Sequence, residues 1–173
     1  MSFLTPPDKS ASIESLWYNS KKILRNTFMK NVGKVTTLFI SVQGSSKRVE
    51  KELFHLDAKG IVEDKYHNTN INRSVLLTSE ASYELANRNN IQMPFGSLGE
   101  NILMDYNPYH LLPGDQMRIG EVVLEISQNC TMCDHLSKID ASLPTLLKDD
   151  RGIFAKVIEG GIIKKEDKIT LLK

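Results

Sequence analysis

The 173-residue sequence lacks long apolar segments, an excess of charge of either sign, and more than two cysteines. Its longest apolar run has only a few residues, so we expect no membrane-spanning helix. Basic and acidic residues nearly cancel, to a formal net charge of +1, which argues against nucleic acid or an anionic membrane as a partner of the whole molecule. The N-terminus does not show the order of basic, apolar and small residues that marks a secretory signal, so we expect a cytoplasmic protein.

In a cytoplasmic protein, two cysteines are kept reduced, so we expect no structural disulfide framework. Both cysteines, Cys130 and Cys133, lie in one segment, residues 128–135, directly after an alternating, strand-like run over residues 120–127. The spacing is that of a zinc half-site, of a thiol–disulfide redox motif or of a sulfur-transfer site. Zinc normally needs four ligands, and only His135 lies close by. A redox motif is expected at a helix N-terminus in a βαβ unit, which this strand-rich chain does not offer.

The chain begins with a proline-containing arm, residues 1–11, after which apolar residues recur at helical spacing over residues 12–30. We expect this amphipathic helix to pack on the domain; its basic face leaves a membrane-surface helix as the alternative. From Gly33 onward the pattern changes to strands. The predicted organisation is therefore an N-terminal arm and helix, residues 1–32, followed by one domain, residues 33–173.

Within that domain, short β-branched and apolar runs alternate with turn signals, which predicts a mainly β (β-rich α+β) fold, either a barrel or a sandwich. The polar run 43–48 predicts a turn. A helix is predicted over residues 79–88, with Ala81, Leu85 and Ala86 on its buried side, and a shorter one over residues 139–148. The strands are predicted over residues 34–42, 49–56, 73–79, 101–104, 116–119, 121–127, 153–159 and 168–172.

Three further segments carry residues suited to binding. Residues 60–67 combine a glycine turn with acids and a histidine, although a solvated loop explains them as well. Residues 96–102 hold two glycines followed by an acid and an amide, an arrangement that lets backbone amides approach a ligand, or that forms a tight turn. Arg151 opens a strand directly after two aspartates. It forms either a local ion pair or, with Arg73, Lys156 and the cysteine segment, a site for an anionic ligand.

Taken in order, these segments resemble the MOSC domain, named for the C-terminal domain of molybdenum cofactor sulfurases, and a stand-alone, bacterial-type member of it. The resemblance spans roughly residues 33–172. It rests on the order of motifs none of which is diagnostic alone: Gly33-Lys-Val, Gly60-Ile-Val-Glu-Asp64, Arg73-Ser-Val-Leu-Leu, Gly96-Ser-Leu-Gly-Glu-Asn101, Leu112-Pro-Gly-Asp115 with Ile119-Gly120, the cysteine that follows Gln128, Arg151-Gly-Ile-Phe-Ala-Lys-Val, and Gly160-Gly161.

The resemblance implies a closed β-barrel with a few flanking helices and a single key cysteine, at the position of Cys133. That cysteine either carries sulfur as a persulfide or coordinates molybdenum in a bound pterin cofactor. Cys130 is its neighbour and is able to resolve a persulfide. The resemblance also implies cofactor contacts for a set of residues: Asp64, His67, Arg73, Gly99, Glu100, Asn101 and Arg151. His67 lies one place beyond the family's histidine, whose position is Tyr66 here.

Three functional hypotheses follow from the resemblance. The protein carries sulfur received from a pyridoxal-phosphate-dependent cysteine desulfurase, as a sulfur transferase. Alternatively, it binds the molybdenum cofactor and reduces N-hydroxylated compounds with electrons from an external electron-transfer protein. The third hypothesis is a ligand-binding accessory module without turnover.

Overall fold

The computed structural model describes residues 30–131 and 135–172. The expected N-terminal arm and helix, up to residue 29, and Cys133 lie outside the described residues. The predicted division into an arm and a domain is therefore untested. Lys30, expected at the end of that helix, instead begins a strand. None of the helices in the described ranges has the length and apolar character needed to cross a membrane.

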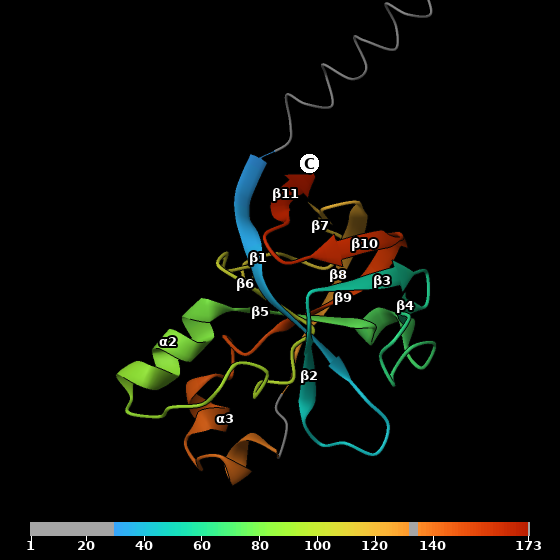
Figure 1. The fold of residues 1–173 in the computed structure, drawn as a ribbon. Coiled ribbons are helices and arrows are strands. Elements are labelled where there is room, and N and C mark those ends of the chain that lie inside the picture. Colours follow the sequence, from blue (N-terminus) through green and yellow to red (C-terminus); the bar gives the residue numbers. More distant parts are fainter. Residues whose placement is uncertain (1–29, 132–134, 173) are drawn as a thin grey trace, which may run out of the picture.

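Within the described residues, seven strands form a closed barrel, and an eighth, β2, extends the sheet from β1 (Figure 1). The order is β11-β7-β8-β9-β5-β6-β1, and β1 closes the ring by pairing with β11. Neighbouring strands run antiparallel except β5 and β6, which run parallel. The bounds are β1 (Lys30–Ser41), β2 (Arg48–Lys51), β5 (Val75–Ser79), β6 (Ile102–Met104), β7 (Gln116–Ile119), β8 (Val122–Asn129), β9 (Ile153–Glu159) and β11 (Lys168–Leu172).

A second, three-stranded sheet of β10 (Gly161–Lys164), β3 (Leu53–Asp57) and β4 (Gly60–Ile61) lies beside the barrel. The single strand predicted over residues 49–56 is two strands in different sheets, β2 and β3, separated at Glu52. The strand β10 was not predicted, because the turn signal Gly160-Gly161 led directly into it. Burial alternates along β3, where Phe54 and Leu56 face inward and are buried, whereas Leu53, His55 and Asp57 are exposed.

One side of the barrel is covered by two helices, α2 (Glu80–Arg88) and α3 (Leu143–Leu146), with a 3₁₀ turn at Leu136–Lys138 (Figure 1). The Ser79 side chain caps α2 by accepting from the Ala81 amide, as expected for a serine at that position. The predicted buried face of α2 was wrong in part. Ser82, Tyr83 and Ala86 are buried, because the helix turns Tyr83 beneath the loop at residues 96–100. The second helix is also shorter than predicted.

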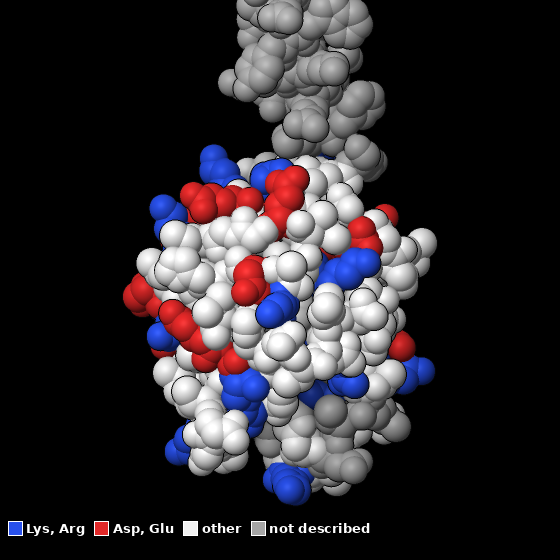
Figure 2. Space-filling model, turned by 90° about the vertical axis from the view of Figure 1, so that its right-hand side faces the viewer, with Lys and Arg blue, Asp and Glu red and all other residues white. Residues whose placement is uncertain are grey.

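The fold confirms the mainly β prediction and decides for a closed barrel over a sandwich. Apolar side chains fill its interior, among them Leu38, Leu77, Met117, Leu124 and Ile126, each at most 1% exposed. On the outer face shown in Figure 2, lysines and arginines lie interspersed with acidic residues, in keeping with the near-zero net charge. A strongly cationic site therefore has to be sought in a local hollow.

Candidate functional site

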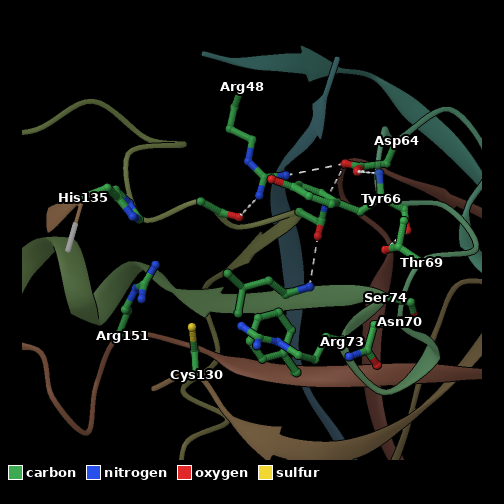
Figure 3. A pocket seen from close by; sticks show the side chains of 14 residues that line it. Arg48, Asp64, Tyr66, Thr69, Asn70, Arg73, Ser74, Cys130, His135 and Arg151 are labelled. Atoms are coloured by element: carbon green, nitrogen blue, oxygen red, sulfur yellow. Dashed lines mark hydrogen bonds and ion pairs between the residues drawn. The ribbon is translucent and has the colours of Figure 1, made fainter. Parts of the chain in front are cut away.

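A pocket of about 400 Å³ opens where several barrel strands begin or end. Its walls come from the start of β2, the loops before β5 and β6, the end of β8 and the start of β9 (Figure 3). Three arginines face one carboxylate, so the pocket carries a net positive charge. The lining residues are Arg48, Asp64, Tyr66, Thr69, Asn70, Arg73, Ser74, Leu76, Gly99, Asn101, Cys130, His135, Arg151 and Phe154.

Arg48 enters the pocket from the first residue of β2. Its Nη2 donates to the carbonyl of Gly99, and its Nη1 lies 3.5 Å from Oδ2 of Asp64. Burial lowers the pKa of the Arg48 guanidinium, while the negative charge of Asp64 opposes that shift. Nη1 is buried and has no hydrogen-bond acceptor among the described residues. Nη1 therefore meets Asp64 through charge alone, without a hydrogen bond.

Arg151 lies on the opposite wall and is only 4% exposed. Its Nη1 donates to the Thr131 carbonyl at 3.0 Å and its Nη2 to the Leu98 carbonyl at 3.3 Å. Its Nε is buried and has no acceptor in the described part of the chain. The alternative of a local ion pair does not describe this side chain, because both of its recorded bonds run to backbone carbonyls of other segments.

Arg73 stands at the outer side of the pocket, at the end of the 3₁₀ turn Ile71–Arg73. Its guanidinium lies over the Phe154 ring, 4.5 Å from the ring centroid. The stacking orients an otherwise exposed side chain while leaving its donors accessible. Arg73 therefore adds a third cation at the entrance.

Asp64 and Asn101 form the polar wall between Arg48 and the barrel. Asp64 accepts from the amides of Ser41 at 2.7 Å and Tyr66 at 2.9 Å, and from Nδ2 of Asn101 at 3.1 Å. Asn101 also accepts from the Leu76 amide at 3.0 Å and donates to the Phe39 carbonyl at 3.2 Å. Both side chains are thus occupied by bonds within the protein, and they fix the wall on which Arg48 rests.

The glycines of the loop before β6 allow the close approach that the sequence indicated. Gly96 and Gly99 have φ angles of 89° and 83°, which side-chain-bearing residues rarely adopt. At Gly99 the backbone lies directly under the guanidinium of Arg48. The sequence predicted that backbone amides of this loop face a ligand. The structure instead places carbonyl oxygens of the loop against the side chains of the pocket wall.

Cys130 lies at the pocket floor, 4% exposed, in an apolar cluster with Leu76 and Phe154. Its amide donates to the Gly152 carbonyl at 2.9 Å, so the end of β8 is tied to the start of β9. The cysteine segment consequently starts inside the pocket. Because residues 132–134 are not described, the assignments of Cys133 as catalytic residue and metal ligand stay predictions.

His135, at the far end of the cysteine segment, returns to the pocket wall. Its Nε2 lies 3.3 Å from the Ser97 carbonyl. Burial, followed by the charge of Arg151, lowers the pKa of the imidazole. At neutral pH this side chain is therefore mainly uncharged.

The structure does not bring every predicted residue to the pocket. Glu100 is fully buried beneath the loop and faces away from the cavity, towards Tyr83. His67 pairs with Asp57 at 2.9 Å, outside the pocket lining. Lys156 pairs with Glu125 at 2.8 Å and also lies elsewhere. By contrast, Asp64, Arg73, Gly99, Asn101, Cys130 and Arg151 all line the one cavity.

The sequence reading missed Arg48. The polar run 43–48 was interpreted as a turn, yet its last residue starts β2 and directs its side chain inward. The available signal was a basic residue at the very start of a strand, as for Arg151. Four lining residues near Arg73 were missed too, because a loop sequence does not reveal which way its side chains face: Tyr66, Thr69, Asn70 and Ser74.

Within the described ranges, no three His, Cys, Asp or Glu side chains gather closely enough to hold a metal ion. Cys133 lies outside those ranges. The described lining instead combines three arginines and one carboxylate with the thiol of Cys130, a set of side chains suited to an anionic ligand.

A family model of the MOSC domain matches residues 63–170, well over half of the chain. The chain belongs to the MOSC domain family. This confirms the resemblance derived from the ordered motifs. No curated protein sequence matches significantly.

Solved structures show the same fold at low sequence identity. The YuaD protein from Bacillus subtilis is 14% identical, with a TM-score of 0.70 over 83% of this chain and 96% of that one. YiiM from Escherichia coli is 17% identical, with a TM-score of 0.62 over 81% and 70%. YiiM from Geobacillus stearothermophilus is 13% identical, with a TM-score of 0.61 over 84% and 75%. These likenesses support the MOSC barrel as the fold of this chain.

Proposed function

We propose that this MOSC protein binds the molybdenum cofactor in the arginine-lined pocket, with Cys133 as its thiolate ligand. The observation that carries the proposal is the pair of buried guanidinium groups, Arg48 and Arg151, each with one donor that has no acceptor among the described residues. Buried donors without partners are costly, and an anionic ligand between the two walls removes that cost.

The residues present fit such a cofactor in charge and in size. Three arginines against Asp64 favour a phosphate-bearing ligand, and about 400 Å³ lies within the usual range of small-molecule sites. Arg48, Arg73 and Arg151 would hold the phosphate and heteroatoms. The cofactor itself supplies a redox-active metal that accepts a thiolate ligand.

The chain's own residues position the ligand and shield it from water. The stacked Arg73 and Phe154 form one part of the lining, and Leu76 and Cys130 add apolar surface beside them. A thiolate in this segment is stabilised by the positive charge of the neighbouring guanidinium groups. For turnover as a reductase of N-hydroxylated compounds, the protein would need an external electron donor.

A second candidate function, sulfur carriage, is favoured by the position of Cys130 at the same pocket floor. In this hypothesis the Cys133 thiolate accepts a sulfane sulfur from the persulfide of a cysteine desulfurase, whose own cysteine leaves as a thiolate. Attack by Cys130 on the inner sulfur of the Cys133 persulfide then forms a disulfide and releases hydrosulfide. A non-catalytic binding module uses the same pocket without either step.

The experiment is elemental analysis, pterin fluorescence and intact mass of the protein purified without reductant from a host that makes the molybdenum cofactor. Stoichiometric molybdenum and pterin support the proposal, while a reducible 32 Da increment with neither supports sulfur carriage (the increment is roughly one sulfur atom). Cys133→Ser should abolish the signal, and Cys130→Ser should reduce it less. Equal indifference to both substitutions would contradict a role for the cysteine segment.

A further inference from the structure

Three consecutive carbonyl groups of one loop accept from the cationic and imidazole side chains of the pocket. The carbonyl of Ser97 lies 3.3 Å from Nε2 of His135. The next, of Leu98, accepts from Arg151, and the third, of Gly99, accepts from Arg48. The path of this loop therefore sets the positions of side chains on both walls.

The loop is in turn held from behind by Tyr83 of α2 and by Glu100. Oε1 of Glu100 accepts from the Gly96 amide at 2.8 Å and from the Tyr83 hydroxyl. The same hydroxyl accepts from the Leu98 amide at 3.3 Å. Tyr83 is 7% exposed and Glu100 fully buried, so water does not replace these bonds.

We propose that Tyr83 and Glu100 are positioning residues of the pocket. They hold the backbone at Gly96 and Leu98, and the carbonyls of Leu98 and Gly99 in turn hold the guanidinium groups of Arg151 and Arg48 at the pocket lining. The inference rests on the proposed function only for the identity of the ligand. Long, flexible guanidinium side chains bind more tightly when they are held in place beforehand, because less rotamer freedom is lost on binding.

If the Tyr83 hydroxyl only stabilised the fold, removing another tyrosine hydroxyl that contacts α2 should have the same effect. Tyr109 provides that matched control. Tyr109 is partly buried; its hydroxyl accepts from the Ser79 amide at 2.9 Å and contacts the Ser82 hydroxyl of α2. It has no recorded bond to the loop at residues 96–100. Tyr83→Phe and Tyr109→Phe thus remove the same atom from two sides of one helix.

The test combines two measurements on the full chain: proton exchange of the arginine Nε–H groups by NMR, and titration with inorganic phosphate. Tyr83→Phe should speed exchange at Arg48 and Arg151 and weaken phosphate binding, each about tenfold, the equivalent of one lost hydrogen bond. Tyr109→Phe should change neither. Glu100→Gln keeps an acceptor at Oε1 and should stay within about threefold of the unmodified protein.

Equal effects of Tyr83→Phe and Tyr109→Phe on both measurements would overturn the inference. So would unchanged arginine exchange in Tyr83→Phe, because the loop would then not set the arginine positions. If the unmodified protein fails to bind phosphate while Tyr83→Phe still frees the arginines, the anion-binding function fails and the positioning role stands. Thermal unfolding of each variant establishes that the barrel has formed.

Discussion

Buried side chains inside the barrel are apolar and contact one another, whereas the pocket lining also contains buried charged and polar side chains that bond to backbone groups. Leu124 and Ile126 of β8 belong to the first region, and Arg151 belongs to the second, although β8 and β9 are neighbours. The interior owes its stability to volume and contact area. The pocket depends on the direction of each donor, so the two regions should respond differently to the same kind of change.

The largest loss of stability is expected from truncating the interior. Leu124→Ala removes a fully buried side chain and should lower the free energy of unfolding by about 2–5 kcal/mol, through lost burial and a residual cavity. Urea denaturation measures the change. Phosphate affinity of the folded variant should remain as before; a comparable loss of affinity would show that the two regions are not separable.

In the pocket, the larger effect is expected on binding. Arg151→Gln removes a charged donor from the wall and should weaken phosphate binding about 10–100-fold, since hydrogen bonds to charged groups contribute roughly 1.5–3 kcal/mol. Arg118→Gln is the matched control. Arg118 pairs with Glu159 at 2.9 Å, away from the pocket, so its loss changes net charge equally. Calorimetric titration measures both affinities. Equal losses of phosphate affinity in the two variants would mean that Arg151 acts only through long-range charge.

The pH dependence of stability should distinguish the regions further. Burial raises the pKa of Glu100 above its ordinary value of 4.5, although hydrogen bonds from Tyr83 and Gly96 oppose the shift. The native state then holds the proton more tightly than the unfolded chain. The contribution of Glu100 to the free energy of unfolding is therefore fully present below pH 4.5, and it is lost as the pH rises through the native pKa.

Glu100→Gln should accordingly have a flatter stability profile above pH 4.5 than the unmodified protein. Denaturant titrations across that range measure both profiles. Leu124→Ala serves as the reference, because its destabilisation involves no proton and should not vary with pH. Parallel profiles for the unmodified protein and Glu100→Gln would contradict a raised pKa.

The smallest effect is expected at the surface. Lys156→Gln breaks a partly exposed pair with Glu125, a contact that contributes about 0–1 kcal/mol. Phosphate affinity should not change, since Lys156 lies outside the pocket lining. A clear loss of affinity on calorimetric titration would restore Lys156 to the binding site, where the sequence reading had placed it.

The regular parts of the fold were predictable because their signals are local. Ser79 before a run of helix formers predicts the start of α2, and β-branched runs predict most strands. The split between β2 and β3 was not predictable, because the one residue between the two strands, Glu52, carries no turn signal. Which residues of α2 face inward depended on the loop at residues 96–100, a contact that no local pattern contains.

The candidate site was predictable only as a set of motifs. Arg73 and Arg151 stood out by residue type, but convergence with Arg48 arises from barrel closure. Glu100 illustrates the limit most clearly. Its place beside Gly99 and Asn101 suggested a ligand contact, whereas its side chain turns to Tyr83 and supports the loop from behind.

The most direct test of the arginine pocket is a phosphate titration of the unmodified protein, followed through the arginine Nε–H signals. Saturable shifts at Arg48, Arg73 and Arg151, with the signal of Arg118 unchanged, are the predicted result. Equal, non-saturating shifts at all four arginines would mean that phosphate meets only general surface charge. That outcome would contradict a built anion site and, with it, the proposed place of the cofactor.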